Sequence, residues 1–99
     1  MPLFAIICTD KPEEGLKLRQ QNRANHLQWL ADLGDAVKAA GPFLDDDGNP
    51  AGSLIIIEAE SRAAAEALAG QDPYRKAGVF AQVEIRPWKW LINPPAELA

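Results

Sequence analysis

The sequence has little of what common catalytic and metal-binding motifs require. Among its 99 residues there is one cysteine, Cys8, and one histidine, His26. A lone cysteine cannot form an internal disulfide bond, and zinc sites need several cysteine or histidine ligands. The sequence also lacks a glycine-rich phosphate loop, a nucleophile elbow and a dinucleotide-binding fingerprint. We therefore expect no metal and no cofactor.

The chain also lacks an excess of positive charge and a long apolar run. Its formal net charge is −4, whereas nucleic-acid-binding surfaces are usually basic. The apolar run at residues 3–8 is far shorter than a membrane span of about 20 residues, and it has no basic lead or cleavage site. We expect a cytoplasmic protein, with neither nucleic acid nor a membrane as a partner.

An acidic segment, Asp45-Asp46-Asp47-Gly48-Asn49, superficially resembles a calcium-binding loop. Such a loop has 12 residues and needs a glutamate at its last position. Counted from Asp45, that position holds Ile56. The segment is therefore predicted to be a solvated turn between strands.

Apolar runs and turn residues divide the chain into short elements. The length and the 47% share of hydrophobic residues indicate one domain over residues 1–99, with 88–99 as a C-terminal tail. Strands are predicted at 3–8, 35–40, 53–59 and 79–86, and helices at 13–33 and 61–70. The segment 43–52 is rich in turn-forming residues and is predicted to be neither strand nor helix.

This β-α-β-β-α-β order predicts an α+β, ferredoxin-like fold, in which a four-stranded antiparallel sheet carries two helices on one face. The first and third strands lie at the centre of such a sheet. Residues 3–8 and 54–57 are apolar in succession, as central strands should be. The second and fourth predicted strands carry polar residues instead, which agrees with edge positions.

The continuous apolar runs in the central strands also predict a partner. Two helices cover one face of the sheet, and the other face would expose apolar residues to water. Trp88 and Trp90 add apolar area that a small domain can hardly bury alone. The simplest cover is a second copy, sheet against sheet, because twofold dimers are the commonest soluble oligomers. The alternative is that the tail folds across the sheet.

His26 is the one side chain suited to proton transfer near neutral pH. It shares a stripe of the first helix with Arg19 and Arg23, which could hold an anion. The alternative is an ordinary solvated helix face. Asp72 precedes Pro73 and by itself is best explained as a helix cap. A carboxylate that accepts a hydrogen bond from an imidazole would orient the ring, but local sequence does not show whether these two residues meet.

Several short segments carry a resemblance to a known family. They are Arg23-Ala24-Asn25-His26-Leu27, Ala40-Gly41-Pro42-Phe43, Gly52-Ser53, Gln71-Asp72-Pro73-Tyr74, Ala77-Gly78-Val79 and Arg86-Pro87-Trp88. In these segments, and in their order, the chain resembles the YciI-like proteins of the dimeric α+β barrel superfamily. The aspartate-rich loop and residues 90–99 depart from the family pattern.

The resemblance implies a dimer joined through its sheet faces and a pocket for a small molecule. By motif position it implies His26 and Asp72 as a catalytic acid–base dyad. It further implies a set of ligand-binding residues, namely Arg23, Gly41, Pro42, Phe43, Ser53, Pro73 and Tyr74.

Two classes of function follow from this set. The first is a cofactor-independent lyase or isomerase that acts on a small anionic or hydroxylated ring compound, because the superfamily includes enzymes with such proton-transfer chemistry. The second is a non-catalytic module that binds a small molecule or a partner subunit. A third reading is a structural dimer whose pocket has lost its activity.

Overall fold

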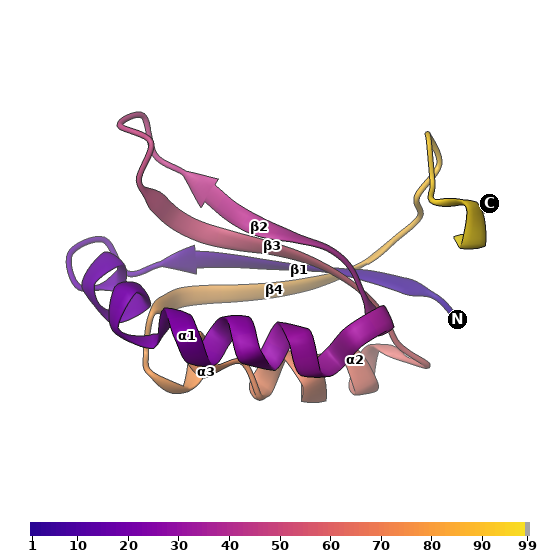
Figure 1. Cartoon of the computed structure of the whole chain (residues 1–99), viewed down its shortest axis with the longest axis horizontal. Helices are drawn as coiled ribbons and strands as arrows, with labels where there is room; N and C mark the ends of the chain where they lie inside the picture. Colours follow the sequence, from indigo (N-terminus) through magenta and orange to yellow (C-terminus); the bar gives the residue numbers. More distant parts are fainter. Residues whose placement is uncertain (99) are drawn as a thin grey trace.

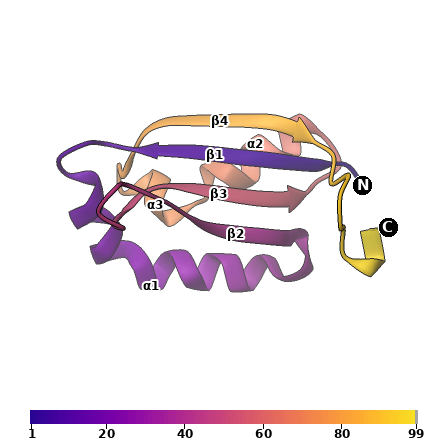
Figure 2. The ribbon, with the colours of Figure 1, turned by 90° about the horizontal axis from the view of Figure 1, so that it is seen from above.

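An antiparallel four-stranded sheet with α1, α2 and α3 on one side is the frame of the molecule (Figures 1 and 2). The computed structural model describes residues 1–98; Ala99, the end of the predicted tail, lies outside them. The strand order is β2-β3-β1-β4, which confirms the predicted ferredoxin-like fold. The elements are β1 (Leu3–Asp10), α1 (Gly15–Leu33), η1 (Gly34–Ala36), β2 (Val37–Leu44), β3 (Pro50–Glu58), α2 (Arg62–Gly70), α3 (Pro73–Lys76), β4 (Phe80–Trp88) and η2 (Ala96–Leu98).

The hairpin between β2 and β3 differs from the prediction. The segment 43–52 was expected to be neither strand nor helix, yet β2 runs to Leu44 and β3 begins at Pro50. Within the turn, the Asp45 carboxylate accepts hydrogen bonds from the backbone N–H groups of Asp47 and Asn49, both at 2.9 Å. The predicted strand at 35–40 also starts late, since η1 precedes β2. Backbone pairing along the sheet edge outweighs the polar composition here.

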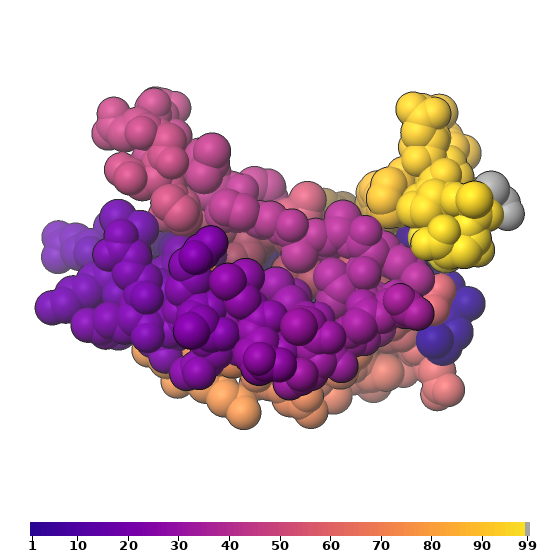
Figure 3. All heavy atoms as spheres, viewed as in Figure 1, coloured from indigo at the N-terminus to yellow at the C-terminus, as the bar shows by residue number. Residues whose placement is uncertain are grey.

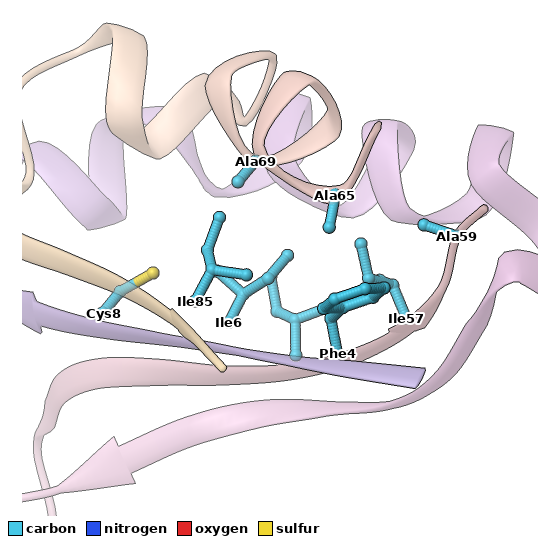
Figure 4. Close-up of a cluster of buried hydrophobic side chains, with 9 residues drawn as sticks. Phe4, Ile6, Cys8, Ile57, Ala59, Ala65, Ala69 and Ile85 are labelled. Carbon is cyan, nitrogen blue, oxygen red and sulfur yellow. The ribbon is translucent and has the colours of Figure 1, made fainter. Parts of the chain in front are cut away.

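The core lies between the sheet and the helices. Alternate residues of β1 and β3 point toward the helices, and α2 presents small residues to them. Figure 4 shows Ala65 and Ala69 of α2 directly above the isoleucine side chains of the sheet. Small side chains let the helix approach closely. The buried cluster comprises Phe4, Ile6, Cys8, Ile55, Ile57, Ala59, Ala65, Ala69 and Ile85.

The opposite face of the sheet carries no helix. Ile7 pairs with Leu54 across β1 and β3, and the alternation of side chains places both on this open face. The β2–β3 hairpin and the C-terminal segment both project on this side, with a hollow between them (Figures 1 and 3). The segment after β4 rises at one end of the sheet and does not cross it (Figure 2). Among residues 1–98, no helix is long and apolar enough to cross a membrane.

Candidate functional site

One face of α1 carries the charged side chains of the site. Arg19, Arg23 and His26 lie four and three residues apart, so they share a helix face. The helix runs alongside the β2 edge of the sheet, with α3 packed beside it (Figure 2). Arg19 and His26 are buried in this position, whereas Arg23 is exposed. The stripe is therefore not a uniformly solvated helix face.

His26 and Asp72 meet, although 46 residues separate them. The imidazole Nδ1 lies 2.8 Å from Asp72 Oδ1. Because a carboxylate only accepts hydrogen bonds, this contact favours the tautomer of the neutral imidazole that carries its proton on Nδ1 and its lone pair on Nε2. Both side chains are buried. The same Oδ1 also accepts the backbone N–H of Tyr74 at 2.9 Å, so Asp72 caps α3 as well as holding the histidine.

Tyr74 forms the second support of the histidine ring. The two rings are stacked, with centroids 3.8 Å apart and planes inclined by 10°. Burial raises the pKa of the Tyr74 phenol, and the positive charge of Arg19 only partly opposes this. The guanidinium carbon of Arg19 lies 4.6 Å from the centroid of the Tyr74 ring. The phenol is therefore protonated at neutral pH and can donate a hydrogen bond.

Arg19 takes part in a buried ion pair that local sequence did not reveal. Its Nε and Nη2 donate to the two carboxylate oxygens of Asp10 at 2.9 and 2.7 Å. Nη2 also donates to Ser53 Oγ at 3.1 Å. Burial alone would lower the pKa of Arg19, but the hydrogen bond and charge of Asp10 outweigh it and raise that pKa. Arg19 is thus a fixed cation.

A cavity of about 420 Å³ lies between α1 and the β2–β3 edge. The predicted residues on its wall are Arg23, His26, Gly41, Pro42, Ser53 and Tyr74. Asp72 holds the histidine from behind, and neither Asp72 nor Pro73 is on the wall. Phe43 is also off the wall, because it pairs with Gly52 and its side chain lies against that glycine. Arg19, which the sequence placed on the same stripe as His26, also lies on the wall. The other wall residues were not predicted, namely Leu16, Gln20, Leu27, Leu30, Ala40, Asn49, Pro50 and Ile55.

Comparison with known proteins matches the chain to one family model. The model of the YCII-related domain covers residues 2–89. Protein YciI of Escherichia coli O6:H1 is 38% identical over 95 residues, which cover 88% of this chain and 96% of that protein. An uncharacterized protein of Haemophilus influenzae is 35% identical over 94 residues, with 87% and 95% covered.

Solved structures show the same fold. A 5-chloro-2-hydroxyhydroquinone dehydrochlorinase from Burkholderia phenoliruptrix, in complex with 2,5-dihydroxybenzoquinone, superposes with a TM-score of 0.80 and 37% identity. The match covers 88% of this chain and 93% of that one. A dimeric ferredoxin-like protein of unknown function from Jannaschia superposes with a TM-score of 0.52 at 14% identity, over 90% and 99% of the two chains. The second likeness is one of fold alone.

Proposed function

Because this chain belongs to the YCII-related family, we propose that it is a cofactor-independent acid–base enzyme acting on a small hydroxylated ring compound. The reaction is of the lyase or isomerase type. One observation carries the proposal: His26, on the cavity wall, is held by a 2.8 Å hydrogen bond to the buried Asp72. This is the arrangement by which a carboxylate fixes the orientation and tautomer of a catalytic imidazole.

His26 acts as the base in this proposal. With Nδ1 bound to Asp72, Nε2 is the nitrogen left to accept a proton from a ring hydroxyl. The imidazolium that forms is stabilised by the Asp72 carboxylate and by the face of the Tyr74 ring. After the proton has left the ring oxygen, its electron pair is available to expel a leaving group from the conjugated ring or to shift a double bond.

Arg23 supplies the contact for an anionic substituent. Its side chain is exposed and lines the cavity, and no carboxylate within residues 1–98 forms an ion pair with it. A guanidinium so placed can bind a carboxylate or phenolate without first breaking an internal contact. Gly41 and Pro42 line the cavity as part of β2. The cavity volume suits a single ring with small substituents.

The substrate class rests on the dehydrochlorinase likeness. That enzyme removes hydrogen chloride from a chlorinated trihydroxybenzene. In such an elimination the ring first adopts a keto tautomer, in which one hydroxyl proton has moved to the carbon that bears chlorine. A second ring hydroxyl then gives its proton to a base, and chloride leaves that carbon with the electron pair of the carbon–chlorine bond. His26 is suited to accept the proton. We therefore assign this chain to hydroxylated rings as a class.

The test combines turnover and binding. Purified protein is incubated with 5-chloro-2-hydroxyhydroquinone and other hydroxylated aromatic compounds, and chloride release and ultraviolet absorbance are followed. His26→Gln and Asp72→Asn should reduce turnover about 10²-fold or more, while Gln28→Ala, on an exposed position of the same helix, should not. If 2,5-dihydroxybenzoquinone binds wild type and His26→Gln equally and no compound is turned over, the protein is a binding module and the enzyme proposal is wrong.

We also propose that the protein is a homodimer joined through its open sheet faces. The supporting observations are the apolar side chains of that face, including Ile7 and Leu54, and the 39% exposure of Trp88 at the end of β4. A second copy would remove this area from water.

Light scattering of wild type should give twice the mass of one chain. Leu54→Lys should give a monomer, and Glu60→Lys, at an exposed position outside the sheet, should leave the dimer intact. A monomeric wild type contradicts the proposal.

A further inference from the structure

Ser53 is a buried hydroxyl with one hydrogen-bonding role satisfied. It lies on β3, and strand alternation turns it toward the helices together with Ile55 and Ile57. Its side-chain oxygen accepts a hydrogen bond from Arg19 Nη2 at 3.1 Å. Only 3% of the residue is exposed, yet it lines the cavity. A buried hydroxyl in this position normally uses its proton as well.

The contact with Arg19 determines which hydrogen-bonding role of the Ser53 hydroxyl remains free. A guanidinium can donate and cannot accept, so the Ser53 proton is not directed at Arg19. Within residues 1–98 no protein acceptor forms a hydrogen bond with that proton. Ser53 therefore presents a donor, polarised by a cation behind it, on the wall of the cavity that also holds His26.

Asp10 makes this arrangement rigid. Its two carboxylate oxygens bind Nε and Nη2 of Arg19, so the guanidinium cannot rotate to meet a ligand itself. Both side chains of the ion pair are almost fully buried. The positive charge is thus held at a fixed place beneath Ser53, where it can stabilise negative charge in the cavity without any rearrangement.

We propose that Ser53 is a specificity-determining residue, positioned by Arg19 and Asp10, that donates a hydrogen bond to a second oxygen on the ring substrate. This inference rests on the proposed function and names the substrate class more narrowly, as a ring in which a hydroxyl is conjugated with a carbonyl oxygen. The hydroxyl gives its proton to His26 Nε2. The negative charge spreads through the ring to the carbonyl oxygen, which Ser53 binds.

The delocalised charge of the deprotonated ring explains why His26 and Ser53 act together. Removal of the proton leaves an electron pair that is shared between conjugated oxygens. No bond other than the oxygen–hydrogen bond breaks in this step, and the proton stays on the imidazole. A donor at the second oxygen becomes stronger as that oxygen gains charge, which is the property that favours the transition state over the bound substrate. A ring with one oxygen would leave Ser53 without a partner.

The test uses 2,5-dihydroxybenzoquinone as a probe, with binding followed by its visible absorbance. Ser53→Ala should weaken binding about 10-fold or more, as expected when a hydrogen bond to a charged group is lost. Ser53→Thr, which keeps the hydroxyl, should restore most of the affinity. Ser61→Ala, the same change at the cap of α2, is the matched control and should bind as wild type does.

A second measurement separates positioning from mere packing. The spectrum of the bound probe reports its ionisation, and a Ser53 donor favours the anionic form. In Ser53→Ala the midpoint pH of this ionisation should rise. The expected rise is about one pH unit for each tenfold loss in the preference of the site for the anionic probe over the neutral probe. Arg19→Lys keeps the charge but not the paired donors, so an intermediate shift is expected. If Arg19→Lys unfolds, the Ser53 variants still decide the matter.

The outcomes distinguish this inference from the proposed function. If Ser53→Ala binds the probe within twofold of wild type and with the same midpoint, while His26→Gln is impaired, this inference is overturned and the acid–base proposal stands. If Ser53→Thr is as weak as Ser53→Ala, the space around Ser53 matters and its hydroxyl does not, which also overturns it. If wild type fails to bind the probe, the substrate class is wrong and both proposals fall.

Discussion

The imidazole of His26 lies flat on the ring of Tyr74, with centroids 3.8 Å apart. Asp72 holds the edge of the same imidazole and also caps the helix that carries Tyr74. The histidine belongs to α1, but both of its supports come from the start of α3. Its orientation is therefore determined by how α1 and α3 pack together, and changes in α3 should act on the histidine directly.

The stacked ring gives the first prediction. Tyr74→Phe keeps an aromatic face against His26 and should leave the fold and the histidine environment nearly unchanged. Tyr74→Leu loses the stacking and leaves space in a buried site, and it should lower the free energy of unfolding by about 2 kcal/mol or more. Urea unfolding measures the stability, and the upfield ring-current shift of the His26 protons measures the stack. Equal chemical shifts of the His26 protons in the two variants would contradict the stacking of His26 on Tyr74.

Asp72 has two roles that substitutions can separate. Asparagine is a good helix cap, so Asp72→Asn should still accept the backbone N–H of Tyr74. It lacks the negative charge that stabilises the imidazolium, and turnover should therefore fall about 10²- to 10⁴-fold. Asp72→Ala loses the cap as well and should cost about 1 kcal/mol more in stability. Nitrogen NMR of wild type should find the proton of the neutral imidazole on Nδ1. A proton on Nε2 would contradict the proposed base.

The sheet order was predictable because burial differs between its strands. The runs at 3–8 and 54–57 are apolar at every position, which marks the central strands. The β2 edge was predicted poorly for the same reason. Its residues from Ala39 to Leu44 are exposed and include Gly41 and Pro42, which are uncommon inside strands, so the order of this segment comes from backbone pairing with β3. The polar residues before Pro50 then concealed the length of the hairpin.

The site was only partly predictable. No local pattern could bring His26 to Asp72, and the family resemblance alone suggested the pair. The partner of Arg19 was missed because Asp10 lies beyond the end of the strand predicted at 3–8. Alternation carried a usable signal, since Asp10 continues the helix-facing series of Phe4, Ile6 and Cys8. A charged residue at the end of such a series needs a buried partner.

Cys8 should make stability depend on alkaline pH. Burial raises the pKa of its thiol to about 12, with a smaller contribution from the charge of Asp72. Between pH 9 and 12 the unfolded chain releases this proton and the native chain keeps it, so stability falls as the pH rises. The loss should approach 1.4 kcal/mol per pH unit, or about 2 kcal/mol by pH 10.5.

The comparison with Cys8→Ala isolates this effect, because the other titrating groups are common to both proteins. The variant should be less stable at neutral pH, since it loses buried volume, but its decline between pH 8 and 10.5 should be shallower. Urea unfolding at several pH values measures both slopes. Two outcomes would show that Cys8 is not buried as described. One is an equal decline of stability with pH in wild type and Cys8→Ala, and the other is rapid reaction of the native thiol with iodoacetamide at pH 8.

The two ion pairs near the start of α1 should differ strongly in strength. Asp10 and Arg19 are buried and share two hydrogen bonds. Asp10→Asn leaves the guanidinium charge uncompensated, and we expect a loss of about 3 kcal/mol or more in the free energy of unfolding. Glu14 pairs with Lys11 at 3.9 Å on the surface. Glu14→Gln, the matched control, should change stability by less than about 1 kcal/mol.

A double variant tests the physical reason for that loss. If the cost of Asp10→Asn comes from an unpaired buried charge, then removing the charge as well should recover part of it. Asp10→Asn combined with Arg19→Met should therefore be more stable than Asp10→Asn alone, as measured by urea unfolding. The double variant should nevertheless bind 2,5-dihydroxybenzoquinone more weakly than wild type does, because it lacks the Arg19 cation behind Ser53. If the two losses in stability simply add, the ion pair does not account for the burial of Arg19.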